Sequence, residues 1–266
     1  MKTLAVLVGL LALCETGWAI YAPYRVPSEA EWQAASAEVR KHLGPHDLIV
    51  FAPLWMDQVG RQHLGDKIPL EMAARADNDH YDRVWEISLR GAHAPDARGA
   101  KVIEERSFGS LTLRLFYKPI EPVSYDFTSH FWQGQVSEVD RRGIEQRRST
   151  TLLPRVLEVD YQPRRGILAP VAGDHMTRIE FSNVALQSRL IVYTGVHDYY
   201  ARKVADGAVD FRIIVDGIEQ AHIVHHNHDG WKRFELATSA GSKTVRFEIS
   251  SPQPAWRTFG FHAEAR

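Results

Sequence analysis

The last third of the chain alternates apolar and polar residues with a period of two, and this pattern restricts the fold more than any other feature. Every second residue is apolar from Val209 to Val215, where Asp216-Gly217 follows, and again from Val245 to Ser250. Such alternation between Asp-Gly or Gly-Ser breaks is typical of half-buried antiparallel strands. The pattern therefore predicts an antiparallel β-sandwich of jelly-roll type.

Further segments of strand length lie between about residue 120 and this region. We expect strands within Tyr125–Val139 and at Arg155–Tyr161, Gly166–Ala169, Thr177–Phe181 and Arg189–Thr194, with a charged loop at Arg141–Ser149.

The first part of the chain mixes helical and strand patterns. Ser28 and Glu31 form a capping box that opens a helix, which Gly44-Pro45 ends. Asp47–Ala52 is a continuous apolar run suited to a buried parallel strand, and a second helix is expected between Trp55 and Gly65. We also expect a strand at Arg83–Leu89 and a hairpin of Lys101–Arg106 with Leu111–Tyr117. This order predicts a small α/β domain.

A proline-rich stretch at Pro119–Pro122 is the best candidate for a domain boundary. We therefore predict an α+β chain of two domains: a small α/β domain at residues 28–118 and the β-sandwich at residues 123–266.

Residues 1–24 form a membrane anchor or a signal segment. Lys2 precedes the apolar run Leu4–Leu13, and small residues follow, which is the layout of a signal peptide. The longer stretch to Tyr21 reaches about the length of a membrane span, although Glu15 makes insertion costly. We expect a single-pass inner-membrane protein with its body in the periplasm, or a protein secreted to the periplasm after signal cleavage.

Charge argues against binding to nucleic acid, and the cysteine content excludes a disulfide within the chain. The chain carries 32 basic and 33 acidic residues, a net charge of -1, so no global field favours nucleic acid. Cys14 is the single cysteine, so no disulfide can form within the chain.

The segment Ala221–Gly230 holds the most concentrated set of metal-type ligands. On a strand, His222 and His226 point to one face, and a hairpin could bring His228 beside them as a Zn²⁺, Cu²⁺ or Ni²⁺ site. The alternative, which we favour, is a polar exposed hairpin that tolerates histidines, and we expect no cofactor.

A second candidate site is a loop at the rim of the sandwich. It offers His197, Asp198, Tyr199 and Tyr200. Aromatic faces stack on sugar rings while carboxylates bind hydroxyl groups, so this loop could bind a glycan. The alternative is that both tyrosines pack under the loop or against a partner protein.

No catalytic motif is found in the sequence. There is no G-x-S-x-G or G-x-x-x-x-G-K sequence, and the carboxylates form no recognisable pair. The tryptophans are assigned to the two cores or their junction: Trp55, Trp85, Trp132, Trp231 and Trp256.

Two parts of the chain resemble a known family. The segments Gly44–Trp55 and Tyr81–Ser88 resemble the soluble extracytoplasmic tail of bacterial glycosyltransferases of the protein-mannosyltransferase type. The C-terminal half, with Gly230-Trp231 and Phe259–Phe261, is similar to jelly-roll domains that accompany some of these enzymes. It is also similar to carbohydrate-binding modules. Those enzymes carry their catalytic carboxylates in a region of many membrane helices, which this sequence does not contain. The resemblance therefore implies a non-catalytic role.

We rank three functions from the sequence. The first is a membrane-anchored interaction protein, an accessory or stabilising subunit of an integral membrane complex or partner of a polytopic membrane enzyme. The second is a periplasmic carbohydrate-binding protein linked to envelope glycans. The third is a metal-assisted enzyme that uses the histidine cluster.

Overall fold

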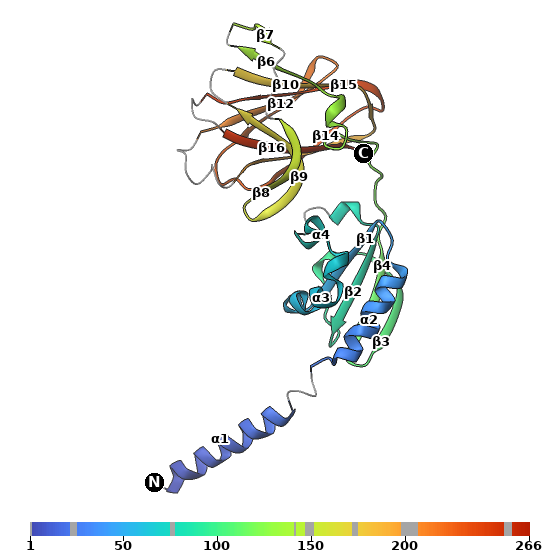
Figure 1. Ribbon diagram of the computed structural model, residues 1–266, viewed down its shortest axis with the longest axis vertical. Helices are drawn as coiled ribbons and strands as arrows, with labels where there is room; N and C mark the ends of the chain where they lie inside the picture. The colour runs from blue at the N-terminus through green and yellow to red at the C-terminus, as the bar shows by residue number, and fades with distance from the viewer. Residues whose placement is uncertain are drawn as a thin grey trace. The chain divides into compact units, whose positions relative to one another are not determined.

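The computed structural model describes residues 2–21, 26–74, 78–140, 142–146, 152–171, 175–197, 207–252 and 257–266. The chain divides into two compact units, Met1–Ile120 and Glu121–Arg266, and the division falls in the proline-rich stretch (Figure 1). Each unit has its own core of buried apolar residues.

The N-terminal segment forms helix α1 (Lys2–Tyr21), in which Trp18 packs against Tyr21 with ring centroids 6.3 Å apart. In the part of the chain that the structure describes, we find no helix that combines the length and the apolarity needed to cross a bilayer.

The first unit is the predicted α/β domain. Its elements are α2 (Glu29–His42), β1 (Asp47–Ala52), η2 (Leu54–Met56), α3 (Asp57–Leu64), η3 (Gly65–Lys67), α4 (Leu70–Ala74), η4 (Asn78–His80), β2 (Arg83–Leu89), η5 (Pro95–Ala97), β3 (Lys101–Phe108) and β4 (Leu111–Tyr117). The strands form one sheet of order β1-β2-β4-β3. β1 and β2 are parallel, as the unbroken apolar run of β1 predicts, and the other pairs are antiparallel.

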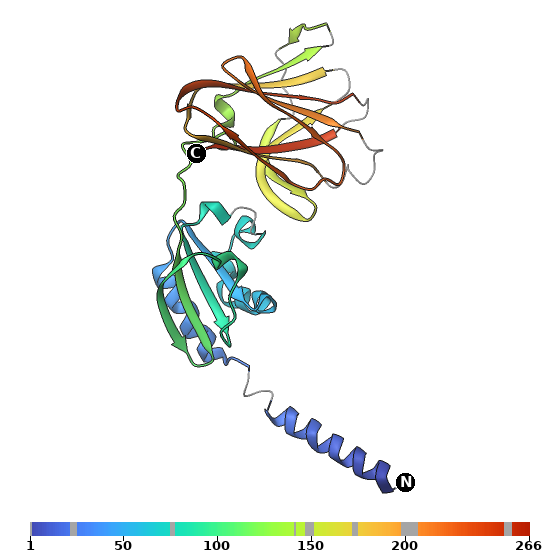
Figure 2. The same ribbon diagram turned by 180° about the vertical axis from the view of Figure 1, so that it is seen from behind.

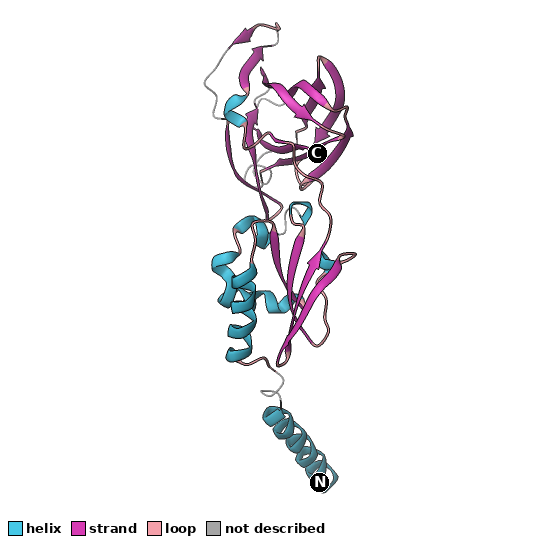
Figure 3. Cartoon of the chain, turned by 90° about the vertical axis from the view of Figure 1, so that its right-hand side faces the viewer, coloured by secondary structure: helices cyan, strands magenta, loops and turns pink. Residues whose placement is uncertain are grey.

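Helix α2 begins at the predicted capping box. The Ser28 hydroxyl accepts a hydrogen bond from the Glu31 backbone N–H at 3.3 Å, and the Glu31 carboxylate accepts one from the Ser28 N–H at 2.6 Å. The same carboxylate also accepts from the Ser110 N–H at 2.9 Å, which joins the helix to the β3–β4 turn. A side chain at Gly109 would overlap Glu31, so this contact requires glycine there. Helices α2 and α3 cover one face of the sheet (Figure 3).

The second unit is an antiparallel β-sandwich. Its elements are β5 (Tyr125–Asp126), η6 (Phe131–Gln133), β6 (Gln135–Asp140), β7 (Glu145–Gln146), β8 (Leu153–Val159), β9 (Gln162–Val171), β10 (His175–Leu186), β11 (Arg189–Val196), β12 (Val209–Val215), β13 (Ile218–His225), β14 (Lys232–Ala237), β15 (Gly241–Ser250) and β16 (Arg257–Ala265). Sheet C has the order β13-β12-β15-β10-β6-β7, and sheet B has the order β14-β11-β16-β9-β8, with β5 paired to β16.

Successive strands from β10 to β16 pass repeatedly between the two sheets, as in a jelly roll. The alternation in the sequence determines which side chains face the core between the two sheets. Among them, Phe211, Phe247 and Phe261 are fully buried, with ring centroids 4.9–5.6 Å apart. The fold class predicted from the sequence is therefore confirmed.

The β8–β9 hairpin bends strongly (Figure 2, in yellow). Gly195 and Gly260 lie opposite each other on β11 and β16. A Cβ atom at Gly260 would lie 2.2 Å from the Leu157 side chain, and one at Gly195 would lie 2.8 Å from Val159. The two glycines thus leave the outer face of sheet B open for the side chains of β8.

The assignment of five tryptophans to the two cores or their junction is wrong for two of them. Trp85 is 2 % exposed, but Trp55 is 63 % exposed and Trp132 is 80 % exposed. Trp231 lies over Gly195 on the outer face of sheet B, where its indole N–H donates to the Gln162 carbonyl at 2.8 Å. Trp256 lies outside the described residues. The two exposed tryptophans, Trp55 and Trp132, lie in the short 3₁₀ helices η2 and η6, where period-two arguments do not apply.

Candidate functional site

A groove of about 490 Å³ opens on the outer face of sheet C, where β6, β7 and β10 lie side by side (Figure 1). Period-two geometry places alternate side chains of these strands on this face. Its walls are formed by Gln135, Val136, Ser137, Glu145, Arg178 and Glu180. The lining therefore contains amide, hydroxyl, carboxylate and guanidinium groups, with one apolar side chain.

An ordered polar network fixes the centre of the groove. Arg178 Nη1 lies 3.1 Å from Glu145 Oε2, and its Nη2 lies 3.2 Å from Glu248 Oε1 on β15. The Ser137 hydroxyl donates to the other oxygen of Glu145. This hydrogen bond, followed by the charge of Arg178, lowers the pKa of Glu145 below its usual value. Glu145 is therefore a carboxylate acceptor at neutral pH.

The network continues across the sheet as a row of paired residues. The register aligns His222, Arg212, Glu248, Arg178 and Ser137 on five adjacent strands. Opposite charges on directly opposed residues, here Arg212 with Glu248 and Glu248 with Arg178, stabilise antiparallel pairing. This row therefore forms a polar band across the outer face of sheet C, and the groove lies at its β6 end.

An exposed aromatic ring precedes the groove in the chain. Trp132 in η6 is 80 % exposed and lies three residues before Gln135. Its ring packs edge-on against the buried Phe131, with centroids 5.0 Å apart. The contact supports one side of the indole, while most of its surface is open to a ligand.

The histidine segment is the end of strand β13 and the turn after it. His222 is exposed on β13, His226 is exposed just after the strand ends, and His228 lies in the turn with φ +66°. His222 Nε2 lies 2.7 Å from Asp210 Oδ1. Among the described residues, His222, His226 and His228 do not form a group with ligand atoms within 4.8 Å of one another. Metal binding at these three histidines stays a prediction without a preformed ligand set.

His225 points the other way, into the sandwich. It is fully buried, and the Thr194 hydroxyl lies 3.3 Å from its Nδ1. Burial lowers the pKa of His225 to about 4, because the charged imidazole is poorly solvated between the sheets. His225 is therefore a neutral core residue at physiological pH.

The predicted rim loop begins where β11 ends. His197 is half-buried, and its backbone N–H donates to the Thr258 carbonyl at 2.9 Å, so it lies at the end of sheet B. Asp198, Tyr199 and Tyr200 lie outside the described residues. A ligand site on this loop stays a prediction.

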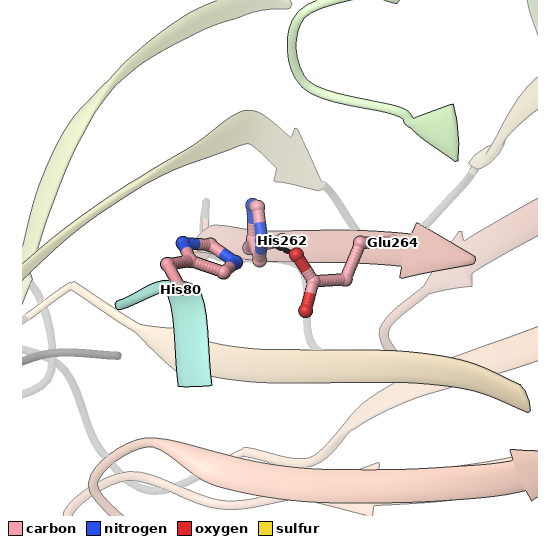
Figure 4. Close-up of side chains that lie close together, drawn as sticks. All are labelled: His80, His262 and Glu264. Carbon is pink, nitrogen blue, oxygen red and sulfur yellow. Dashed lines mark ion pairs between the residues drawn. The ribbon is translucent and has the colours of Figure 1, made fainter. Parts of the chain in front are cut away.

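A second polar pair occurs on β16, at the outer face of sheet B. His262 and Glu264 are two residues apart and therefore share a face, with His262 Nε2 3.6 Å from Glu264 Oε2 (Figure 4). The Thr128 hydroxyl lies 3.2 Å from His262 Nδ1, and Arg266 lies 2.6 Å from the second oxygen of Glu264. These contacts fix the end of β16 against the segment after β5.

The groove residues are not predicted from the sequence, and the expected charged loop Arg141–Ser149 is wrong at Glu145–Gln146, which form β7 by pairing with β6. Ser137, Glu145 and Arg178 lie on three strands, and Glu145 and Arg178 are 33 residues apart in the chain. Only strand pairing brings them together. The available signal was the alternation of charged residues on β10, where Arg178 and Glu180 occupy one face.

No family model matches the chain, and no curated protein matches it. The chain is similar to solved β-sandwich structures. One contains the CBM51-2 and INT domains of Clostridium perfringens ZmpB, with a TM-score of 0.34, 13% identity, and coverage of 60% of this chain and 36% of that chain. Another contains the tandem CBM51 modules of a family 98 glycoside hydrolase from Streptococcus pneumoniae, with a TM-score of 0.37, 12% identity, and coverage of 60% and 57%.

A third is a family 35 carbohydrate-binding module from Clostridium thermocellum, with a TM-score of 0.30, 10% identity, and coverage of 44% of this chain and 90% of that chain. The chain spans 36% and 40% of the length of the two ZmpB structures that contain the INT domains. Likeness at this level defines neither a family nor a ligand for this chain. The class that its own topology defines is a jelly-roll-type sandwich preceded by an α/β domain.

Proposed function

We propose that the chain is a non-catalytic carbohydrate-binding protein that holds a glycan in the groove of sheet C. The observation that carries the proposal is the lining of the groove, in which Gln135, Arg178 and Glu145 present donors and acceptors within one hollow of about 490 Å³. Binding sites for small molecules commonly have volumes of roughly 300–1,000 Å³ and a few positioned polar groups.

A sugar suits this lining because each hydroxyl group both donates and accepts hydrogen bonds. The carboxylates of Glu145 and Glu180 accept, the guanidinium of Arg178 donates, and the amide of Gln135 does both. Trp132 is not among the residues that line the groove, but it lies three residues before Gln135 and is 80 % exposed. We propose that a glycan that extends beyond the groove stacks the C–H side of a sugar ring on this indole.

The same electrostatics favour binding over hydrolysis. Hydrolysis of a glycosidic bond needs one carboxyl group with a raised pKa as the general acid. The pKa of Glu145 is lowered, chiefly by the Ser137 hydroxyl, so this group remains an anion. A carboxylate that stays ionised is an acceptor for hydroxyl groups rather than a proton donor.

The test is binding of the purified full-length chain to an array of bacterial envelope glycans, followed by calorimetry with the best ligand. The variants Trp132→Ala and Gln135→Ala should each reduce the affinity by about tenfold or more, which corresponds to about 1.4 kcal/mol. Both side chains are exposed, so the melting temperature should not change.

Trp55→Ala is the matched control, since this tryptophan is also exposed, at 63 %, but lies in the other unit. Its affinity should equal that of the unaltered chain. Retention on no glycan, or equal binding by Trp132→Ala and Trp55→Ala, would refute the proposal.

A second candidate function is an accessory subunit or partner of a polytopic membrane enzyme, as the resemblance to mannosyltransferase tails implies. Exposed apolar side chains on the first unit support it: Leu54 is 67 % exposed, beside Trp55. Exposed aromatic and aliphatic residues mark interaction surfaces. Purification from native membranes should then recover a stable complex that Leu54→Ser/Trp55→Ser loses; a chain that purifies alone excludes this role.

The proposed location is the periplasmic side of the inner membrane, held by residues 1–24 or released after their cleavage. The support is the sequence of this segment, with Lys2 before the apolar run. A reporter active only in the periplasm, fused to the C-terminus, should give signal. Signal from a cytoplasmic reporter instead would reverse this orientation.

A further inference from the structure

The α/β unit contains a second hollow, unrelated to the groove of the sandwich. It has a volume of about 360 Å³ and is lined by the loop after β2, with His93, Ala94, Pro95, Ala97 and Arg98. The small apolar residues form its walls, and the two residues that can carry positive charge, His93 and Arg98, provide its polar groups.

A buried carboxylate holds His93 in place. Glu86 on β2 is fully buried, and its Oε1 lies 3.2 Å from His93 Nδ1. The His93 ring also packs edge-on against Phe116, with centroids 6.4 Å apart at 78°. Because Nδ1 faces the buried carboxylate, Nε2 lies on the opposite side of the ring, and the side chain is 58 % exposed.

Both oxygens of Glu86 already accept hydrogen bonds. The Ala94 backbone N–H donates to Oε2 at 2.6 Å, and Arg114 Nη1 donates to Oε1 at 3.1 Å. Arg114 also binds Glu105 at 2.7 Å. The carboxylate therefore anchors the loop and orients the imidazole, and it is not available as a ligand for a cation.

From this arrangement we propose that the loop binds a small oxyanion, a phosphate or carboxylate group, between His93 Nε2 and the Arg98 guanidinium. The side chains that give the hollow its polar groups are an imidazole and a guanidinium, so the ligand that suits them supplies acceptors and negative charge. Arg98 is exposed and forms no ion pair within the described residues. Ala94 and Ala97, which are buried, leave room for an oxyanion that carries a small organic group.

The charged groups around the His93 ring are Glu86, Arg114, Glu105 and Arg98. Glu86 and Glu105 both pair with Arg114, which leaves the Arg98 guanidinium to attract an anion.

The experiment is calorimetric titration of the full-length chain with inorganic phosphate, methyl phosphate and acetate, together with NMR of the imidazole nitrogens. We expect binding by at least one of the three anions, with a shift of the His93 Nε2 signal. His93→Gln and Arg98→Ala should each weaken that binding at least tenfold. Both residues are exposed, so both variants should fold.

His42→Gln is the matched control. His42 also lies beside a carboxylate, with Nε2 3.4 Å from Glu38 Oε1, but on helix α2 and not in the hollow. It should bind as the unaltered chain does. Tighter binding of acetate than of both phosphates assigns a carboxylate ligand, and the reverse assigns a phosphate. No binding at about 10 mM of any anion, or equal binding by His93→Gln and His42→Gln, overturns the proposal.

Discussion

His225 illustrates how one residue position decides the role of a side chain. It lies between exposed neighbours, yet strand parity places it on the inner face of sheet C, where it is fully buried beside Thr194. Its pKa is lowered to about 4 by burial, from the ordinary value of 6.5. The fold therefore keeps the imidazole neutral, and this makes the free energy of unfolding depend on pH.

We predict that the sandwich loses stability on acidification through His225. Below about pH 6.5 the unfolded chain binds a proton at this position, whereas the folded chain does not until about pH 4. The unfolded state therefore gains stability as the pH falls, and the loss for the fold reaches about 3 kcal/mol near pH 4. Urea unfolding at about pH 7 and about pH 4.5 should measure most of this difference.

The variant His225→Gln removes this titration, so its stability should change less between the two pH values than that of the unaltered chain. His226→Gln is the control, because His226 is exposed and adjacent in the sequence. It should keep the full pH dependence. An equal pH dependence in His225→Gln and the unaltered chain would show that His225 does not contribute.

At the scale of elements, helix α3 approaches the sheet through a glycine. Gly60 is buried, and a Cβ atom there would lie 2.1 Å from the ring of Phe51 on β1. Phe51 is 1 % exposed, so its ring has little room to move. The close contact of helix backbone and ring therefore depends on the missing side chain.

We predict that Gly60→Ala destabilises the α/β unit by about 1–3 kcal/mol, the usual cost of overpacking a core. Alanine favours a helix over glycine by about 1 kcal/mol, but that gain is smaller than the cost of the overlap. The midpoint of denaturant unfolding measures the change.

Gly65→Ala is the comparison. Gly65 follows α3 with φ −61°, and a Cβ atom there would meet only the Arg61 Cβ at 4.0 Å. This variant should be neutral or more stable by about 0.4–1 kcal/mol, because alanine restricts the unfolded chain. Equal destabilisation by both variants would contradict a role for the contact with Phe51.

Strand β16 shows what the sequence pattern leaves out. Phe259, Phe261, Ala263 and Ala265 are fully buried and alternate along it, so the signal for a strand is present. No strand is predicted there from the sequence, because alanine and glycine favour strands weakly and their propensities are poor guides to a central strand. Pairing with β11 and β9 on both sides determines the conformation.

For the whole molecule, the division into two units predicts independent folding of the sandwich. Residues 121–266 contain a complete core of their own. Expressed alone, they should give a far-UV circular dichroism spectrum of mainly strand and a cooperative thermal transition. A helical spectrum, or a transition without cooperativity, would show that the sandwich needs the first unit.

The local features of this protein follow from the sequence alone. The capping box at Ser28, the strands β1, β2 and β12, and the inward direction of Phe211 and Phe247 all follow from neighbouring residues, since strand parity and helix capping act over a few positions.

Which strands are neighbours, and therefore where the candidate sites lie, depends on the tertiary fold. The groove needs Glu145 of β7 beside Arg178 of β10, and the second hollow needs His93 of a loop beside Glu86 of β2. Parity fixes the face on which a side chain lies but not its partner, because pairing depends on contacts between distant segments. For the same reason Trp55 and Trp132, which look like core residues in the sequence, are exposed in the fold.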